Sequence, residues 1–143
     1  MENARKSDHE KQGAKLGPLI ILSGPSGSGK STVVDQVLKT TDLPLHLSVS
    51  ATTRAPRPGE QVGVHYYFWS ADQFEREVQA GAFLEWAEVH GFRYGTLRRE
   101  VEPFRQQGDG VILEIDVQGA KQIHRQFPDA VLVFLRGKIT AEG

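Results

Sequence analysis

The stretch that decides the fold reads LIILSGPSGSGKS and runs from Leu19 to Ser31. Its first residues, Leu19–Leu22, form a short apolar run that predicts a strand buried on both faces. The glycine-rich part, Gly24–Ser31, satisfies the pattern G-x-x-x-x-G-K-[ST]. The apolar stripe of a helix follows at Val33, Val34, Val37 and Leu38. A strand before this pattern and a helix after it are the context in which it forms a phosphate-binding loop.

Each part of this phosphate loop has a chemical reason. Glycines let the backbone wrap around phosphate oxygens and point N–H groups at them. A helix that begins near Lys30 directs its positive dipole end at the same anion. Lys30 supplies a mobile charge for the β- and γ-phosphates, and the Ser31 hydroxyl is a ligand for Mg²⁺. The residues predicted to contact a nucleoside triphosphate are Gly24, Pro25, Ser26, Gly27, Ser28, Gly29, Lys30, Ser31 and Thr32. A flexible Gly/Ser turn, the alternative, does not account for the flanking strand and helix.

Composition limits the other classes of function. The chain has 143 residues and a net charge of −1, so no global field favours nucleic acid or an anionic membrane. It has no cysteine, which excludes disulfides and thiolate metal sites, and its five histidines lack ligand spacing. Residues 1–17 are mostly polar and are predicted to form a disordered tail, without the apolar core of a secretory signal. We expect a soluble, cytoplasmic protein that binds neither nucleic acid nor membrane.

The pattern along the rest of the chain predicts strand–helix–strand units at both ends. Alternation of apolar and polar residues from Leu45 to Ser50 predicts a second strand with one polar face. Further along, strands over Val111–Asp116 and Ala130–Leu135 enclose a helix from Gln118 to Phe127. Such units favour an α/β fold, in which a parallel sheet is flanked by helices.

A polar insert separates these units. Residues 51–63 are predicted to be loop. The segment Ser70–Gln73 fits a capping box for a helix that ends near Gly81, and Phe83–Tyr94 is predicted to form short strands around His90-Gly91. The predicted organisation is a tail at 1–17 and a domain at 18–143. Within the domain, core segments at 18–50 and 97–135 enclose a small inserted lobe at 51–96, and the end at 136–143 is atypical.

The insert carries a second candidate anion site. Arg54 and Arg57 lie three residues apart, and prolines between and after them stiffen the chain. Stiffening lowers the entropy cost of presenting two guanidinium groups to one phosphate. The alternative is a solvated loop whose arginines bind nothing. The hydroxyls of Tyr66 and Tyr94 favour binding of a monophosphate.

Recognition of a base is a further possibility. Guanine presents two donors and one acceptor on its Watson–Crick edge, and a carboxylate with hydroxyls is the complementary set. Glu85, Ser50 and Thr96 can supply this set, although spacing alone does not select them from the other polar residues. Asp116 either ends a strand or belongs to the site, since it lies at the C-terminal edge of a parallel strand. Phe83 and Trp86 are predicted to be core residues rather than base-stacking ones.

Several ordered motifs together resemble guanylate kinase, a nucleoside monophosphate kinase. They are Gly24–Ser31, Ser48–Gly59, His65–Phe68, Phe83–Ala87, Tyr94–Thr96 and Leu113–Gly119, and the resemblance covers Leu19–Leu135. It implies the reaction of ATP with GMP to give ADP and GDP in purine nucleotide metabolism, with Mg²⁺ accompanying ATP. It also implies a core parallel sheet, a lobe that binds the monophosphate and a lid over the triphosphate.

The resemblance implies roles for residues at matching positions. Contacts to the GMP phosphate are implied for Arg54, Arg57, Tyr66 and Tyr94. Contacts to the guanosine are implied for Ser50, Glu85, Thr96 and Asp116, and Glu114 is added to the GMP site at a position where many family members have Asp. Lys30 and Arg57 are implied to be catalytic, Arg57 because it neutralises charge as the two phosphates approach each other.

The chain departs from the family pattern after Leu135. The family continues with an arginine-rich lid, a long helix and a final strand, whereas here the sequence reads RGKITAEG from Arg136 to Gly143. We therefore expect weak turnover and an apolar sheet edge at 130–135. Through this edge the chain either forms a homodimer or is left only marginally stable. Two alternatives stay open. One is a module that binds GMP or a phospho-ligand without turnover, and the other is a related kinase that acts on a sugar phosphate.

Overall fold

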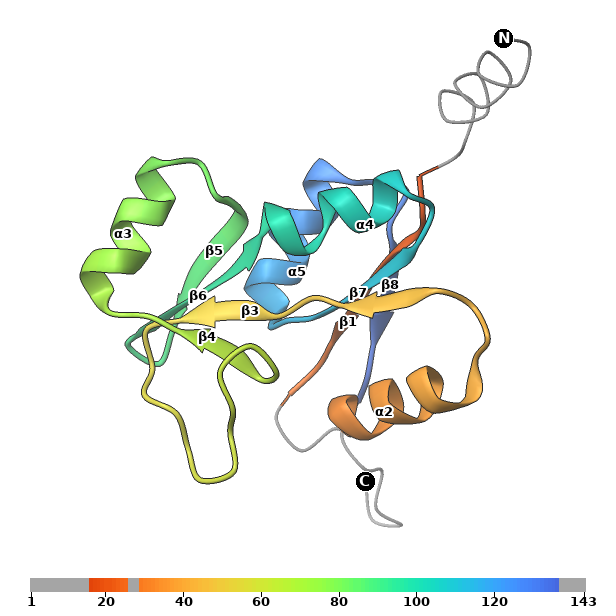
Figure 1. The fold of residues 1–143 in the computed structure, drawn as a ribbon, viewed down its shortest axis with the longest axis horizontal. Coiled ribbons are helices and arrows are strands. Elements are labelled where there is room, and N and C mark those ends of the chain that lie inside the picture. The colour runs from red at the N-terminus through yellow and green to blue at the C-terminus, as the bar shows by residue number, and fades with distance from the viewer. Residues whose placement is uncertain (1–15, 26–28, 137–143) are drawn as a thin grey trace, which may run out of the picture.

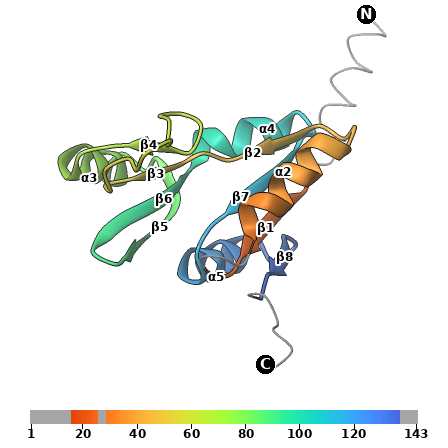
Figure 2. The ribbon, with the colours of Figure 1, turned by 90° about the horizontal axis from the view of Figure 1, so that it is seen from below.

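The computed structural model describes residues 16–25 and 29–136. The predicted tail lies outside these ranges except for its last two residues, as do Ser26–Ser28 of the phosphate loop and residues 137–143. The described chain forms two four-stranded sheets (Figure 1). Figure 2 shows the two sheets as two halves of the molecule, each with its own helices. Within the described ranges, no helix has the length and apolar character needed to cross a membrane.

The first sheet is parallel throughout, as predicted. Its strands are, in spatial order, β2 (Leu45–Leu47), β7 (Gly110–Glu114), β1 (Leu19–Ser23) and β8 (Val131–Phe134), and its helices are α2 (Lys30–Thr40) and α5 (Val117–Gln126). One apolar cluster combines Ile123 of α5 with Leu19, and another combines Val34 of α2 with Leu22. Because side chains alternate between the faces of a strand, β1 is covered on both faces, which confirms the prediction from its apolar run.

The second sheet is mixed and comes from the predicted insert. Its strands are, in spatial order, β4 (Tyr66–Phe68), β3 (Ser50–Thr52), β6 (Phe92–Leu97) and β5 (Phe83–Val89), and α3 (Ala71–Gln79) covers one face. Phe74 of α3 is fully buried against Phe83 and Leu97. The Ser70 hydroxyl accepts a hydrogen bond from the Gln73 N–H (3.1 Å), so the predicted helix start is confirmed.

Two details of the second sheet follow from local sequence. His90 and Gly91 both have positive φ (52° and 83°), which is required of the central residues of a type I′ hairpin turn. The predicted hairpin is therefore confirmed. Phe83 is buried as predicted, but the prediction that Trp86 is a core residue is wrong. Trp86 is 36% exposed on the same strand, and the Arg93 guanidinium lies 4.5 Å from its ring centroid.

The strand predicted from Leu45 to Ser50 is wrong, because the structure divides this segment between the two sheets. Leu45–Leu47 forms β2, while Ser50 already begins β3, so the predicted loop also begins later than residue 51. Ser48 and Val49 carry the chain from one sheet to the other, and both are buried. Alternation of polar and apolar residues cannot reveal such a division, since two half-buried strands in succession produce the same pattern as one.

Other elements differ from the predictions for reasons of tertiary packing. The chain returns from β6 to β7 through the 3₁₀ turn η1 (Arg98–Glu100) and the helix α4 (Glu102–Gln106), which the sequence pattern does not predict. The apolar stripe predicted for α2 is only partly buried, because Val33 and Val37 are exposed. Strand β8 lies at the edge of the first sheet and its four side chains are exposed, as expected for an apolar edge.

Candidate functional site

The phosphate loop connects β1 to α2, as the motif predicts. Gly29 precedes the helix with φ of 92°, a left-handed conformation that favours glycine. Among the described residues, no side chain caps the first turn of α2, so its N–H groups are suited to an anion. The Lys30 ammonium donates to the carbonyl oxygens of Gly24 and Pro25, which holds its charge across the loop. The described part of the loop therefore has the geometry of an anion site.

A hydroxyl and a carboxylate from distant parts of the chain meet beside this loop. Ser31 is the second residue of α2, and Glu114 is the last residue of β7. The Ser31 hydroxyl donates a hydrogen bond to Glu114 Oε1 at 2.8 Å. They meet because parallel neighbours β1 and β7 end at the same edge of the sheet. Within residues 16–25 and 29–136, no group of three His, Asp or Glu side chains could hold a metal ion by itself. One carboxylate and one hydroxyl nevertheless suit Mg²⁺, which keeps several waters and binds substrate phosphates.

Arg54, Tyr66 and Tyr94 come together on the second sheet. Arg54 is buried, and its Nε donates to the Tyr94 hydroxyl at 3.3 Å. Its guanidinium lies 5.2 Å from the Tyr66 ring centroid, and the two tyrosine rings meet edge to face at 5.9 Å. Burial, above all, raises the pKa of Tyr66, and Tyr94 and Glu114 raise it further. The Tyr66 hydroxyl therefore stays protonated as a hydrogen-bond donor, and this cluster lies near Glu114 of the first sheet.

Glu60 is the functional candidate that the sequence did not reveal. Its two carboxylate oxygens accept from Arg54 Nη1 (2.8 Å) and Nη2 (3.0 Å), a bidentate pair. Oε1 also accepts from the Arg57 backbone N–H at 2.7 Å. The hydrogen bond from Arg54, followed by that from Arg57, lowers the pKa of Glu60 to about 2. The only signal in the sequence was a carboxylate six residues after Arg54 in a proline-stiffened loop.

The predicted base-recognition pair is present in the structure. Glu85 of β5 is 6% exposed and accepts a hydrogen bond from the Thr96 hydroxyl of β6 at 2.8 Å. Burial raises the pKa of Glu85 to about 7, and the charge of Asp116 adds to this effect, while the Thr96 bond opposes it. Gly119 lies against the pair, since a Cβ there would be 2.9 Å from Glu85 Oε2 and 3.2 Å from Asp116 Oδ1. A buried carboxylate, a hydroxyl and a second acid thus form one cluster.

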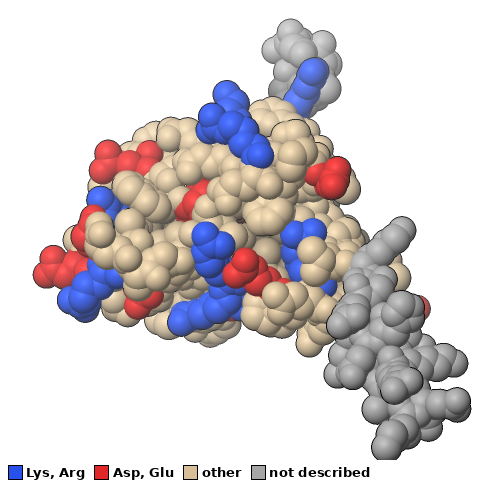
Figure 3. Space-filling model, turned by 90° about the horizontal axis from the view of Figure 1, so that it is seen from above, with Lys and Arg blue, Asp and Glu red and all other residues tan. Residues whose placement is uncertain are grey.

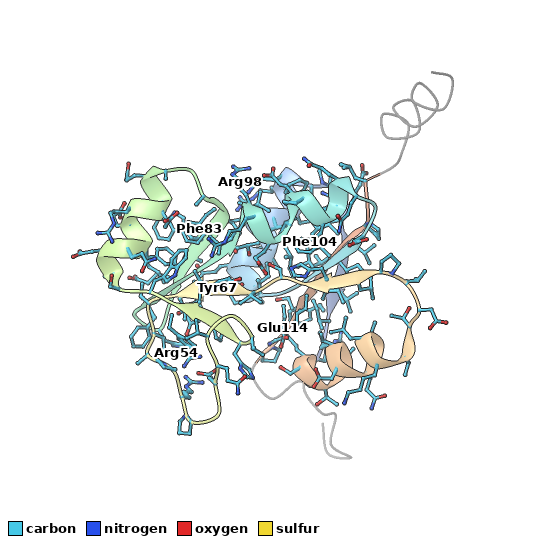
Figure 4. The ribbon with its side chains drawn as sticks, viewed as in Figure 1. Arg54, Tyr67, Phe83, Arg98, Phe104 and Glu114 are labelled. Carbon is cyan, nitrogen blue, oxygen red and sulfur yellow. The ribbon has the colours of Figure 1, made fainter. Side chains whose placement is uncertain are left out.

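Asp116 connects this cluster to the first sheet. Its carboxylate accepts from the backbone N–H groups of Gln118 and Gly119 (both 3.1 Å) and so caps the start of α5. Since β7 ends at Glu114, Asp116 caps a helix rather than ending a strand, and its proximity to Glu85 is consistent with its predicted place in the site. Figure 4 shows Arg54 in the loop beside the second sheet and Glu114 at the end of β7, both on the side of the molecule where α2 begins.

The remaining predicted residues have fewer contacts with the clusters described above. Ser50 begins β3 opposite Tyr66 in the ladder, while Arg57 and Thr32 are exposed. Ser26, Gly27 and Ser28 lie outside the described residues. On the face shown in Figure 3, basic and acidic side chains are interspersed. The small net charge likewise provides no global field that would attract an anion.

Comparison with known proteins gives a consistent result. The family model described as guanylate kinase matches residues 17–142. A guanylate kinase of Fusobacterium nucleatum is 52% identical over 121 residues, which are 85% of this chain and 64% of that protein. For that of Rubrobacter xylanophilus, the identity is 52% over 122 residues, 85% of this chain and 63% of that protein.

A solved structure agrees. The crystal structure of guanylate kinase from Anaplasma phagocytophilum superposes with a TM-score of 0.73 at 35% identity, over 85% of this chain and 61% of that one. The chain thus spans slightly less than two thirds of the length of the relatives that it matches.

Proposed function

We propose, for a chain that belongs to the guanylate kinase family, that it transfers the γ-phosphoryl group of ATP to GMP and forms ADP and GDP. The observation that carries this proposal is the buried Glu85–Thr96 pair beside Asp116. It lies on the same sheet as the Arg54–Tyr66–Tyr94 cluster, and the phosphate loop belongs to the neighbouring sheet. A base site, a monophosphate site and a triphosphate site are therefore available to two nucleotides.

Recognition of guanine follows from the chemistry of the Glu85 cluster. Ionised Glu85 accepts hydrogen bonds from the two donors on the Watson–Crick edge of guanine while Thr96 continues to donate to it, and the Ser50 hydroxyl supplies a donor for the guanine carbonyl oxygen. Adenine presents one donor and one acceptor there, so it leaves the buried carboxylate partly unpaired, which is costly. Asp116 binds the guanosine from the side of the first sheet.

Arg54, Tyr66 and Tyr94 are proposed to bind the phosphate of GMP. Glu60 holds the Arg54 guanidinium at one edge, which leaves its orientation fixed for a phosphate. Arg57 is exposed in the same loop and is proposed to neutralise charge as the two phosphates approach. Charge neutralisation and alignment are the main requirements of phosphoryl transfer.

The loop residues Gly24–Ser31 and Thr32 are proposed to bind ATP, with Lys30 at the β- and γ-phosphates. Ser31 and Glu114 are proposed to hold Mg²⁺, because their oxygens lie 2.8 Å apart and match its preference for hard ligands. When bound, the metal neutralises charge on the phosphate oxygens. This leaves Glu114 at the boundary between the two nucleotides, rather than only in the GMP site. Since ATP and GMP are cytoplasmic metabolites, we also propose a cytoplasmic location.

Two other functions use parts of the same site. A module that binds GMP or a phospho-ligand without turnover needs Arg54, Tyr66 and Tyr94, but it has no use for the contact between Ser31 and Glu114. A sugar phosphate kinase needs the phosphate loop, but it has no use for the buried Glu85–Thr96 pair. The kinase acting on GMP is the function that uses all of these contacts.

An assay of ADP release with GMP, AMP, CMP and UMP tests the proposal. We expect turnover with GMP to exceed that with the other three by at least about a hundredfold, since a buried polar site rejects ligands that leave it unpaired. The variant Glu85→Ala should lose this preference, while Glu88→Ala, an exposed residue of the same strand, should keep it. Equal turnover with all four nucleotides, or none with any, is the result that contradicts the proposal.

A further inference from the structure

The chain passes between the two sheets twice, at adjacent places. It leaves the first sheet after β2 through Ser48 and Val49, and it returns after β6 through η1 and α4. The Val49 N–H donates to Glu100 Oε1 at 2.8 Å, so a hydrogen bond joins the outgoing segment to the returning one. Contacts at this junction influence how the two sheets are oriented.

Glu100 uses both of its carboxylate oxygens at this junction, and it is buried. Besides Val49, Oε1 has the His46 Nε2 atom at 3.2 Å, and Oε2 accepts from the Tyr67 hydroxyl at 3.2 Å. His46 belongs to β2 of the first sheet, and Tyr67 belongs to β4 of the second. One carboxylate therefore joins a strand of each sheet to both crossing segments.

The partners of Glu100 are themselves held in place. The His46 ring stacks on Phe104 of α4, with centroids 3.6 Å apart and planes 6° apart. The Arg99 guanidinium lies 4.9 Å from the centroid of the Tyr67 ring. Burial raises the pKa of Tyr67, and Glu100 raises it further, so the Tyr67 hydroxyl remains a hydrogen-bond donor. Figure 4 shows Tyr67 and Phe104, the outer members of this network.

Apolar packing also joins the two sheets, but it acts differently. Leu84 of β5 and Val101 lie in the same buried cluster as Leu19 and Ile123 of the first sheet and its helix. Hydrophobic contact is non-directional, so it opposes separation more than rotation. Hydrogen bonds depend on angle as well as distance. The bonds of Glu100 are therefore suited to fix an orientation that the apolar cluster leaves adjustable.

We propose that Glu100 is a positioning residue, which orients the second sheet relative to the first so that the GMP site faces the phosphate loop. This inference rests on the proposed function, in which Arg54, just after β3, and Glu85 of β5 belong with the second sheet. Lys30 of α2 and Glu114 of β7 belong with the first. Glu100 touches neither nucleotide site directly. A change of orientation displaces the two phosphates relative to each other, and phosphoryl transfer is sensitive to displacements of about 1 Å.

A distance measurement between the sheets tests the orientation without any need for catalysis. The chain has no cysteine, so Gln36→Cys on α2 and Arg76→Cys on α3, both exposed, provide a unique pair of spin-label sites. Pulsed electron paramagnetic resonance then gives the distribution of distances between the labels. Glu100→Ala should shift or broaden this distribution. Glu100→Gln should preserve it, because the amide keeps an acceptor for Val49 and a polar partner for Tyr67.

Two further variants complete the distance experiment. Glu102→Ala removes an exposed carboxylate two residues away, which pairs with Arg98 at 3.5 Å, and should leave the distribution unchanged. If Glu100→Ala does not fold, Tyr67→Phe takes its place, since it removes only the hydroxyl contact. An unchanged distribution in the folded Glu100→Ala variant, or in Tyr67→Phe as its substitute, overturns the proposal.

Kinetics then separate positioning from stability. In Glu100→Ala, kcat/KM for GMP should fall at least about tenfold, while the Kd for Mg·ATP stays within about twofold of the original value because the phosphate loop lies on the first sheet alone. Glu100→Gln should restore kcat/KM. The positioning role is contradicted if kcat/KM for GMP and the affinity for Mg·ATP fall by the same factor. It is also contradicted if the label distance shifts while kcat/KM stays unchanged. If the unaltered chain does not phosphorylate GMP, the proposed function fails, whereas the distance result still decides the structural part.

Discussion

Two glutamates near the proposed GMP site differ in ionisation because of their surroundings. Glu85 is buried beside Asp116, and its pKa rises to about 7. Glu60 accepts a bidentate pair from Arg54, and its pKa falls to about 2. At neutral pH, Glu60 is therefore a fixed anion, while Glu85 exchanges a proton. In the proposed complex, guanine binds the ionised form of Glu85, so a proton is expected to compete with GMP.

This competition predicts a pH dependence of GMP binding. With a pKa of about 7 in the free protein, the ionised fraction of Glu85 falls from about nine tenths at pH 8 to about one tenth at pH 6. The KM for GMP should rise about tenfold over that range, because the raised pKa favours the protonated form as pH falls. Steady-state kinetics at saturating ATP measure this KM. The variant Glu85→Gln cannot titrate at this position, so any pH dependence of its KM belongs to the GMP phosphate. A KM that is constant from pH 8 to pH 6 contradicts the assignment.

Glu60 leads to a second prediction. Without its carboxylate, the Arg54 guanidinium loses a bidentate partner and gains rotamer freedom, which binding must then restrict at a cost of about 1 kcal/mol. Glu60→Gln should therefore raise the KM for GMP about fivefold, with the Kd for Mg·ATP unchanged. Glu88→Gln on the exposed side of β5 is the matched control. A lower KM in Glu60→Gln would show instead that Glu60 competes with the phosphate for Arg54.

At the residue scale, the sequence predicted residues that contact one another when the motifs of the resemblance contained them. The Glu85–Thr96 and Arg54–Tyr94 contacts agree with the residues chosen from the resemblance. Glu60 and Glu100 were missed, because the partner of a carboxylate depends on which distant backbone and side-chain groups folding brings to it. Nothing in the sequence near Glu100 indicates a bond to Tyr67.

At the scale of elements, the start of α5 limits the space around the proposed base site. Gly119 lies in its first turn, where a Cβ would come within 2.9 Å of Glu85 Oε2 and 3.2 Å of Asp116 Oδ1. Its N–H also donates to Asp116 at 3.1 Å. The helix therefore approaches the two carboxylates closely only because this position has no side chain.

This approach predicts the effect of Gly119→Ala. The added methyl group should displace the Glu85 carboxylate and weaken GMP binding about tenfold, which corresponds to about 1.4 kcal/mol. Stability should fall by less than about 1 kcal/mol, since alanine favours a helix over glycine by a similar amount. Calorimetric titration with GMP and thermal unfolding measure the two effects, and Lys121→Ala, exposed on the same helix, is the control. Unchanged GMP affinity would place the base elsewhere.

Element types were predicted more reliably than their membership in a sheet. The apolar run of β1, the cap of α3 and the β5–β6 hairpin depend on local signals, and all three are confirmed. At the division between Ser48 and Val49, by contrast, the Val49 N–H donates to Glu100, which lies 51 residues away. Hydrophobic alternation contains no information about such a distant partner.

At the scale of the whole molecule, β8 leaves an apolar edge on the first sheet. Its four side chains, Val131–Phe134, are between 38% and 55% exposed. An exposed strand edge of this kind pairs readily with another chain. The described chain is therefore expected to self-associate through β8, and we propose a homodimer on this basis.

Size-exclusion chromatography with light scattering tests the homodimer. The chain should show a mass that rises with concentration toward that of a dimer, and Phe134→Lys should restore the monomer by placing a charge on the edge. Leu43→Lys changes an even more exposed apolar residue, at 70%, away from that edge and should leave association unchanged. A monomer at all concentrations contradicts the prediction.

In the proposed reaction, ATP binds beside the first sheet and GMP beside the second, and the γ-phosphoryl group passes from ATP to GMP. The most direct test is a ³¹P NMR time course of the chain with Mg²⁺, ATP and GMP. We predict that the γ-phosphate signal of ATP decreases while the β-phosphate signal of newly formed GDP increases equally, and that Lys30→Ala abolishes both changes. Release of inorganic phosphate without GDP, or an unchanged ATP signal over the full time course, would contradict the account.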